Sequence, residues 1–235
     1  MRDKNDIMLK PIISADSHVC EPPNCYIDFI DEKFKARAPR LVNDPKRGDV
    51  YRVEGSRHSI PMSLISAAGK SAEELAVRGA RFKDLHRGGW EPHARIKDQE
   101  TDGIAAEIIY PSVGMEICNI PDIDLKQACM EAYNRWLAEF CAPHPHRLIG
   151  LGQCAVRSPE EGIKELEAIH RSGFKGVMLP GLPAKEDYSH EMYTEFFDAV
   201  VELELVPSFH ILTSGDGLTQ NFRGSKINGF MSIVR

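Results

Sequence analysis

Short apolar runs and longer amphipathic segments alternate along the chain from residue 92 onward. The apolar runs are bounded by turn residues and predict β-strands, at residues 105–110, 148–156, 177–180 and 206–212. The segments between the strands repeat apolar positions with helical spacing and predict α-helices, at residues 95–102, 124–142, 159–171 and 191–204. Ser158 before Pro159 is a typical helix start, while Gly103 and Gly173 are typical helix ends. This part of the chain therefore predicts repeated β-α-β units.

A separate apolar run, Pro11–Ala15, comes earlier and leads directly into Asp16 and His18. A β-branched run that stops near a Pro-Pro pair predicts a buried strand ending in a loop. Because residues i and i+2 of a strand share a face, Asp16 and His18 project together. A carboxylate beside an imidazole provides half of a metal site, and His210 follows a second apolar run in a similar context. The pattern indicates a metalloenzyme, although Asp-x-His near a strand end is also common by chance.

Residues 24–95 are rich in charge, glycine and proline and lack a sustained period. A short strand is expected near Asp49–Val53 and a helix near Ser71–Gly79. A long irregular insertion between regular elements is typical of a lid or a packing flap. We interpret residues 1–235 as a single α/β domain with a lid-like insertion at about 24–95.

Repeated β-α-β units imply parallel strands with right-handed crossovers, which leaves a doubly wound sheet or a (β/α)8 barrel. The sequence has no GxGxxG and no GxxxxGK[ST], so it gives no support for dinucleotide or P-loop chemistry. Catalytic residues of a barrel come from the carboxyl ends of several strands, where Asp16, His18 and His210 all lie. This placement favours the barrel. About five strands are present, so the barrel would be incomplete.

Composition changes this picture little. The formal net charge of −6 gives no electrostatic reason to expect a nucleic-acid partner. No apolar stretch is long enough for a membrane span, and the polar start at residues 1–6 favours a cytoplasmic location. The 6 cysteines contain no CxxC pair, so reduced thiols are expected, with Cys20 as a structural thiol.

Several stretches, taken in order, resemble one family. They are Ile13–Pro22, Arg95–Asp98 with Asp102–Glu107, Tyr133–Leu137, Arg147–Gly150, Phe174–Val177 and Pro207–His210. Together the stretches resemble the amidohydrolase-related branch of the amidohydrolase superfamily, which includes aminocarboxymuconate-semialdehyde decarboxylase and the resorcylate decarboxylases. The resemblance implies a TIM barrel that binds one divalent metal ion, often zinc, with Asp16, His18 and His210 as ligands. Members with two metals carry a carbamylated lysine at the end of the fourth strand, where this chain has Leu179-Pro180. A single metal is therefore implied.

The resemblance also implies parts that this chain lacks. The family continues beyond the fifth strand to a catalytic histidine on the sixth strand and an aspartate ligand on the eighth, whereas the sequence ends at residue 235. A C-terminal truncation is therefore expected, and the acid–base residue stays unknown. The implied reaction is hydrolysis of a C–N or C–O bond of a small carboxylated or cyclic substrate by metal-activated water. The alternatives are a non-oxidative decarboxylase of an aromatic or muconate-type acid and an inactive truncated remnant. Members of the family often form homodimers.

Two further residues are candidates near the site. Glu21 is a candidate partner of His18, with a simple turn carboxylate as the alternative. Arg95 is a candidate for binding a substrate carboxylate, but its place at a helix start favours a surface position. His144 and His146 resemble a metal-binding tract, yet their place between a helix and a strand favours surface loop residues.

Overall fold

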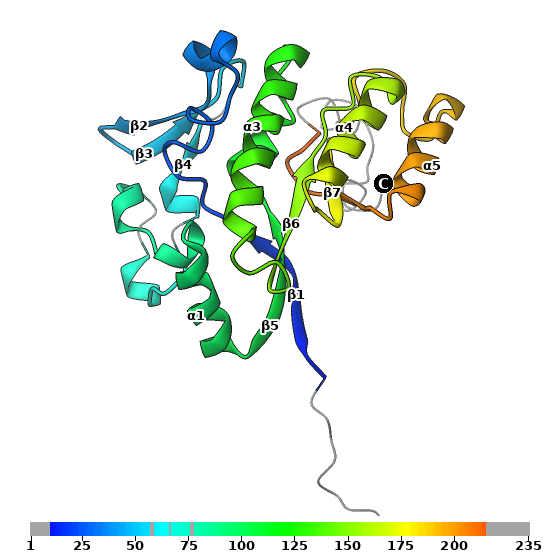
Figure 1. Cartoon of the computed structure of the whole chain (residues 1–235). Coiled ribbons are helices and arrows are strands. Elements are labelled where there is room, and N and C mark those ends of the chain that lie inside the picture. Colours follow the sequence, from blue (N-terminus) through cyan, green and yellow to red (C-terminus); the bar gives the residue numbers. More distant parts are fainter. Residues whose placement is uncertain (1–9, 57–58, 66, 76–77, 215–235) are drawn as a thin grey trace, which may run out of the picture.

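The computed structural model describes residues 10–56, 59–65, 67–75 and 78–214, so the polar start and the end of the chain at 230–235 lie outside the described residues. Five parallel strands form the main sheet in the order β1-β5-β6-β7-β8 (Figure 1). Their bounds are β1 Ile12–His18, β5 Ile104–Tyr110, β6 Leu148–Gln153, β7 Gly176–Leu179 and β8 Val206–Phe209. Apart from the insertion, the order in the sheet is the order in the chain, as in one half of a β/α barrel. The predicted strands are confirmed.

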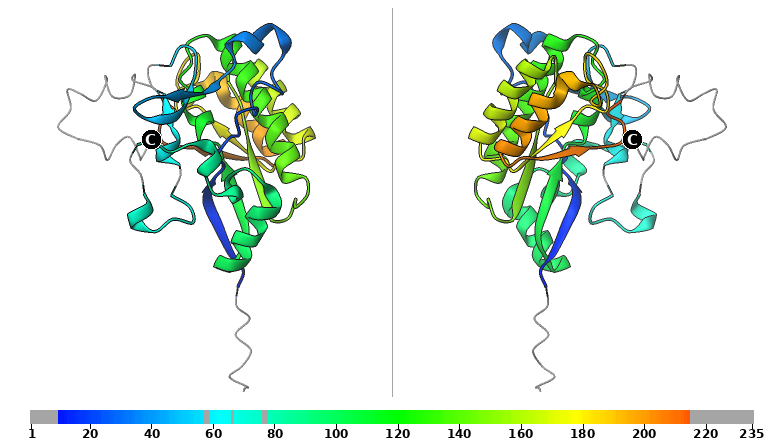
Figure 2. Two further views of the ribbon diagram at one scale, coloured as in Figure 1. Left: turned by 90° about the vertical axis from the view of Figure 1, so that its left-hand side faces the viewer. Right: turned by 90° about the vertical axis from the view of Figure 1, so that its right-hand side faces the viewer.

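The helices between the strands are also confirmed, with bounds α1 Pro92–Asp102, α3 Ile123–Cys141, α4 Pro159–Arg171 and α5 Thr194–Glu202. Figures 1 and 2 show α3 and α4 along one face of the sheet. The Glu91 side chain caps the start of α1 by accepting hydrogen bonds from the backbone N–H groups of His93 and Ala94. Gly103 ends α1 at φ 71°, a left-handed conformation that suits glycine. A short helix, α2 (Val113–Ile117), follows β5 and has no counterpart in the sequence prediction.

The core lies between the sheet and α3. Tyr133, Leu137 and Phe140 are buried on the side of α3 that packs against β6. A Cβ atom at Gly150 of β6 would lie 2.8 Å from a methyl carbon of Leu137. The strand can therefore approach the helix this closely only because residue 150 has no side chain.

The insertion contains a small antiparallel sheet in the order β2-β3-β4, with bounds β2 Arg40–Asp44, β3 Gly48–Arg52 and β4 Ile60–Pro61. The strand expected near Asp49–Val53 is confirmed by β3. The helix expected near Ser71–Gly79 is wrong for the described part of that segment, which holds one 3-10 turn at Ala72–Glu74. Ser71 and Glu74 exchange capping hydrogen bonds as at a helix start, but Leu75 then leaves in an extended conformation at ψ 111°.

The prediction that the first strand is buried is wrong. Ile12 and Ile13 of β1 are 59% and 54% exposed. Within the described residues, β1 pairs only with β5 and forms one edge of the main sheet, while β8 forms the other edge. Branched apolar residues therefore mark a strand here without marking burial.

No helix within the described residues is both long enough and apolar enough to cross a membrane. The six cysteines are all free thiols, and burial raises the pKa of Cys20 to about 12, which keeps its thiol protonated near neutral pH.

Candidate metal centre

Asp16, His18 and His210 meet at the carboxyl ends of β1 and β8, the two edge strands of the main sheet. Asp16 Oδ1 lies 3.2 Å from His18 Nε2 and 3.4 Å from His210 Nε2. The two Nε2 atoms are 3.2 Å apart, although 192 positions separate the two histidines in the sequence. The structure therefore brings together all three of the ligands that the sequence suggests.

The curvature of the sheet makes this meeting possible. His18 ends β1 and His210 directly follows β8, so the two histidines come from opposite edges of a five-stranded sheet. In a flat sheet, four strand spacings would separate these edges by roughly 19 Å. Contact between the imidazoles requires the sheet to curl strongly, as the strands of a barrel do.

A β-bulge in β1 directs Asp16 toward the site. Ser14 pairs with Glu107 and Ser17 with Ile109, so three steps along β1 match two steps along β5. As a result Ser14 and Ser17 share one face, with their Oγ atoms 2.7 Å apart, and Ser17 donates to Glu107. The bulge leaves Asp16 free to turn to the opposite face. Bulges of this kind commonly redirect a side chain beside an active site.

Backbone carbonyl groups orient both imidazoles. His18 Nδ1 lies 2.9 Å from the Pro111 carbonyl oxygen, and His210 Nδ1 lies 3.2 Å from the Ile211 carbonyl oxygen. A carbonyl can only accept, so each Nδ1 carries the hydrogen and each Nε2 offers a lone pair. Burial lowers the pKa of His18, which keeps its ring neutral and able to bind a cation near pH 7.

The donor set fits a divalent cation. Two Nε2 lone pairs and a carboxylate oxygen face one another at 3.2–3.4 Å with no hydrogen between them, an arrangement that is repulsive without a positive charge at its centre. A tetrahedral ion about 2.0–2.1 Å from each donor would set the distances between donors at about 3.3–3.4 Å. Among the described residues, this is the one group of three or more His, Cys, Asp or Glu side chains close enough to hold a metal. Because the Asp16 side chain is 66% exposed, a ligand can approach from that side.

Arg95 belongs to α1 and contacts β5 through Glu107, next to the candidate metal centre. Its guanidinium group forms a bidentate ion pair with Glu107, at 2.7 and 3.2 Å, and both side chains are 12% exposed. Arg95 Nη1 also donates to the backbone carbonyls of His18, at 2.9 Å, and Gly88, at 3.1 Å. The surface position favoured by the sequence is therefore wrong. The ion pair with Glu107 of β5 holds the Arg95 side chain in a mostly buried position. Its contact with His18 passes through the main chain.

Glu21 is fully buried and makes no hydrogen bond with His18 within the described residues. Its Oε1 accepts from the backbone N–H of Gly114, at 3.0 Å, and from the Tyr26 hydroxyl, at 3.4 Å. Burial raises the pKa of this carboxyl to about 7, against the opposing effect of backbone donors at the start of α2. Glu21 thus joins the loop after β1 to α2.

Tyr110, the last residue of β5, is a site residue that the sequence reasoning missed. Its ring centroid lies 5.8 Å from that of His18 and 5.1 Å from that of His210, and its hydroxyl group is 2.6 Å from Ser208 Oγ. Tyr110 therefore packs against both imidazoles at once. Its position before Pro111, at the end of a predicted strand, was the available signal.

Residues 112–227 match the family model described as Amidohydrolase. This segment, just under half of the chain, is similar to the amidohydrolase family. The matched segment includes His210 and begins just after β5. The resemblance seen in the sequence is confirmed.

Solved structures share the fold. An amidohydrolase of Mycobacterium avium subsp. paratuberculosis superposes with a TM-score of 0.70 at 20% identity, over 93% of this chain and 62% of that one. The 5-carboxyvanillate decarboxylase of Novosphingobium aromaticivorans, complexed with manganese and 4-hydroxy-3-methoxy-5-nitrobenzoic acid, gives 0.56 at 20% identity, over 94% and 56%. A dihydroxybenzoic acid decarboxylase of Polaromonas, with bound manganese and 2-nitroresorcinol, gives 0.50 at 16% identity, over 91% and 52%. The chain thus spans between half and two thirds of the length of these structures, and its sheet corresponds to part of a TIM barrel.

Proposed function

We propose that Asp16, His18 and His210 bind one divalent metal ion, and that the protein is a metal-dependent enzyme acting on a small molecule. The observation that carries the proposal is the convergence of one carboxylate oxygen and two imidazole lone pairs at 3.2–3.4 Å. A single ion is supported by the end of β7, where Leu179 and Pro180 stand, while Lys175 lies before the strand begins. That end of β7 therefore offers no lysine to bridge a second ion.

We propose zinc as the ion, because the distances between the donor atoms match tetrahedral coordination by nitrogen and oxygen. Manganese is the competing choice, since it is the metal named for two of the similar decarboxylase structures. A cytoplasmic location and a homodimer stay predictions.

We propose hydrolysis of a C–N or C–O bond in a small carboxylated or cyclic substrate as the first reaction. A bound divalent ion acts as a Lewis acid and lowers the pKa of a water molecule toward neutrality. The chain's own residues hold the site for this chemistry: Asp16 is exposed to an approaching ligand, while Tyr110 packs on both imidazoles. The insertion at about 24–95 is proposed as a lid, and it reaches the end of β1 where Cys20 donates to the Ile65 carbonyl.

Non-oxidative decarboxylation of an aromatic acid is the second candidate. It is favoured by the similar structures, which include decarboxylases of 5-carboxyvanillate and dihydroxybenzoic acid. Release of carbon dioxide from hydroxylated benzoates would support this candidate, and metal-dependent turnover of esters or lactones would support hydrolysis. Absence of both activities in a metal-loaded protein would favour the inactive remnant.

The metal site is tested by elemental analysis of purified protein. We expect about one zinc or manganese ion per chain in the wild type and a sharp loss in His18→Ala and His210→Ala, since each removes a ligand nitrogen. His170→Ala, which alters an exposed histidine on α4, should leave the content unchanged. Equal metal content in the wild type and the two site variants would overturn the assignment.

A further inference from the structure

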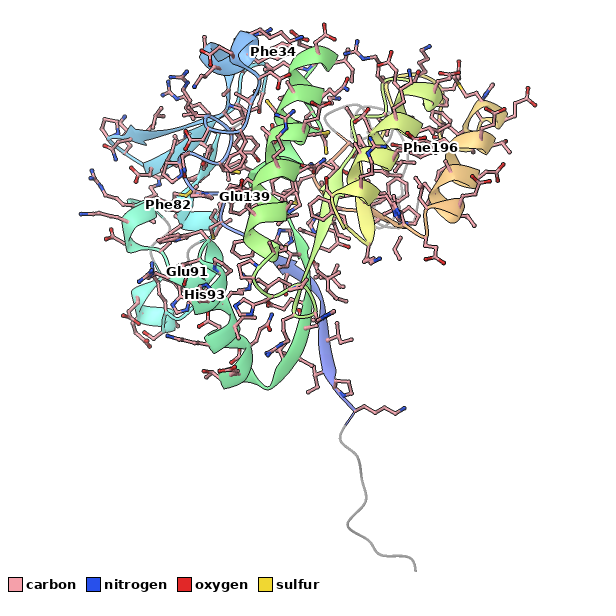
Figure 3. The ribbon with its side chains drawn as sticks, in the orientation of Figure 1. Phe34, Phe82, Glu91, His93, Glu139 and Phe196 are labelled. Carbon is pink, nitrogen blue, oxygen red and sulfur yellow. The ribbon has the colours of Figure 1, made fainter. Side chains whose placement is uncertain are left out.

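A second pair of histidines meets outside the metal centre. His93 is the second residue of α1, and His144 lies in the loop between α3 and β6. His93 Nδ1 is 2.9 Å from His144 Nε2, and the ring planes are nearly perpendicular, at 84°. Figure 3 shows His93 close to Glu91 at the start of α1.

The backbones of both histidines are held in place by other bonds. The backbone N–H of His93 donates to Glu91 Oε1 at 3.0 Å. The backbone carbonyl of His144 accepts from Arg147 and Leu148, each at 2.9 Å. Gln99 of α1 also donates to the Arg147 carbonyl, at 3.2 Å, which fixes the loop against the helix. These bonds hold the two backbones at a spacing that lets the imidazoles meet.

The distance and the surroundings suit a transition-metal ion. Two nitrogens at adjacent corners of a square-planar or octahedral ion, with bonds of about 2.05 Å, lie about 2.9 Å apart, and imidazole is a preferred ligand of copper, nickel and zinc. His93 is exposed, so an ion can reach the pair without crossing the core. Glu91 adds a nearby negative charge, and proximity to His93 contributes to the lowered pKa of that carboxyl.

We propose that His93 and His144 form a second metal site, on the surface, for a late first-row divalent cation, Ni²⁺ or Cu²⁺. The ion would replace the hydrogen bond between the two rings. It would thereby join α1 to the loop after α3, and water molecules would complete its coordination. The site shares no ligand with Asp16, His18 and His210, so it stands or fails independently of the proposed function.

Equilibrium dialysis of the full chain against Ni²⁺ tests the site. The wild type should retain one more Ni²⁺ ion per chain than His93→Gln or His144→Gln, and the affinity of this second ion should fall at least tenfold in either variant. His170→Gln, on an exposed histidine for which the described residues show no side-chain hydrogen bond, should match the wild type. Circular dichroism checks that all variants are folded.

A second set of variants distinguishes Ni²⁺ binding at the surface site from Ni²⁺ binding at the central site. The double variant His18→Ala with His210→Ala should still bind one Ni²⁺ ion, and adding His144→Gln should abolish that binding. If His144→Gln retains as much Ni²⁺ as the wild type, the two rings form only a hydrogen bond and the proposal is overturned. Loss of Ni²⁺ from the double variant itself would also overturn it.

Discussion

At the scale of single residues, main-chain groups rather than carboxylates orient the two imidazoles of the centre. Pro111 supplies the carbonyl for His18, and Ile211 supplies the one for His210. The orientation of each ring therefore depends on how the backbone leaves a strand end. Arg95 strengthens this arrangement at β1, because it holds the carbonyl of His18 itself.

Arg95→Lys should weaken metal binding about 10- to 100-fold, the usual cost of losing a group that supports a ligand. A lysine cannot reproduce the fork that contacts Glu107 and the His18 carbonyl together. Metal affinity measured by competition with a chelating dye checks this prediction. Glu107→Gln is the matched control, since it removes the ion pair but keeps Arg95 beside His18. Equal losses of affinity in both variants would indicate general destabilisation instead.

Glu21 makes stability depend on pH. Burial raises its pKa from the ordinary 4.5 to about 7, so the folded state holds the proton more tightly than the unfolded state. Stability should therefore fall as the pH rises from about 5 to about 8. Glu165, whose pKa burial also raises to about 7, acts in the same direction.

Glu21→Gln should reduce the loss of stability between pH 5 and pH 8, because the amide stays neutral throughout this range. Thermal unfolding followed between pH 5 and pH 8 measures the effect. Glu167→Gln, on an exposed position of α4, should leave the wild-type slope unchanged. A wild-type melting temperature that rises over this range would contradict the prediction.

At the scale of elements, helix starts are specified by local side chains. Asp122 caps α3 and Ser158 caps α4, each by accepting hydrogen bonds from backbone N–H groups in the first turn. Such caps depend only on neighbouring residues, so the helices between strands could be predicted closely from the sequence.

Ser158→Ala should lower the free energy of unfolding by about 1 kcal/mol, because the N–H of Glu161 then loses its side-chain acceptor. Denaturant unfolding measures the change. Ser189→Ala, at an exposed position outside the helices and strands, should change stability by less than about 0.5 kcal/mol.

At the scale of the whole molecule, the centre joins the two edges of the main sheet. Asp16 and His18 belong to β1, and His210 follows β8. An ion bound there would connect the first and last strands of that sheet, so binding and folding should be coupled.

Zn²⁺ at 100 times its dissociation constant should therefore stabilise the folded chain by about 2.7 kcal/mol. The shift in melting temperature on adding Zn²⁺ measures this coupling. The variant His210→Ala, which lacks one of the three ligands, is the comparison. If the wild type and His210→Ala respond alike to Zn²⁺, the coupling through this centre is wrong.

Sequence reasoning succeeded where the determinants are local and failed where they depend on tertiary neighbours. The strands and helices beyond residue 92 follow from periodicity and caps, and the three candidate ligands follow from strand ends. The exposure of Ile12 could not be predicted, because an edge strand and a central strand can share the same composition. The burial of Arg95 depends on Glu107 facing it from another element, a contact that periodicity does not reveal.

The distance between the ligands along the chain has a consequence for synthesis. Asp16 and His18 are made early, whereas His210 follows 192 positions after His18. A nascent chain that has not yet extended past residue 210 offers only an adjacent carboxylate and imidazole, which is a weak chelate. High-affinity metal uptake would therefore report that the whole curved sheet has been translated and folded, and metal supplied during translation would be retained only after that point.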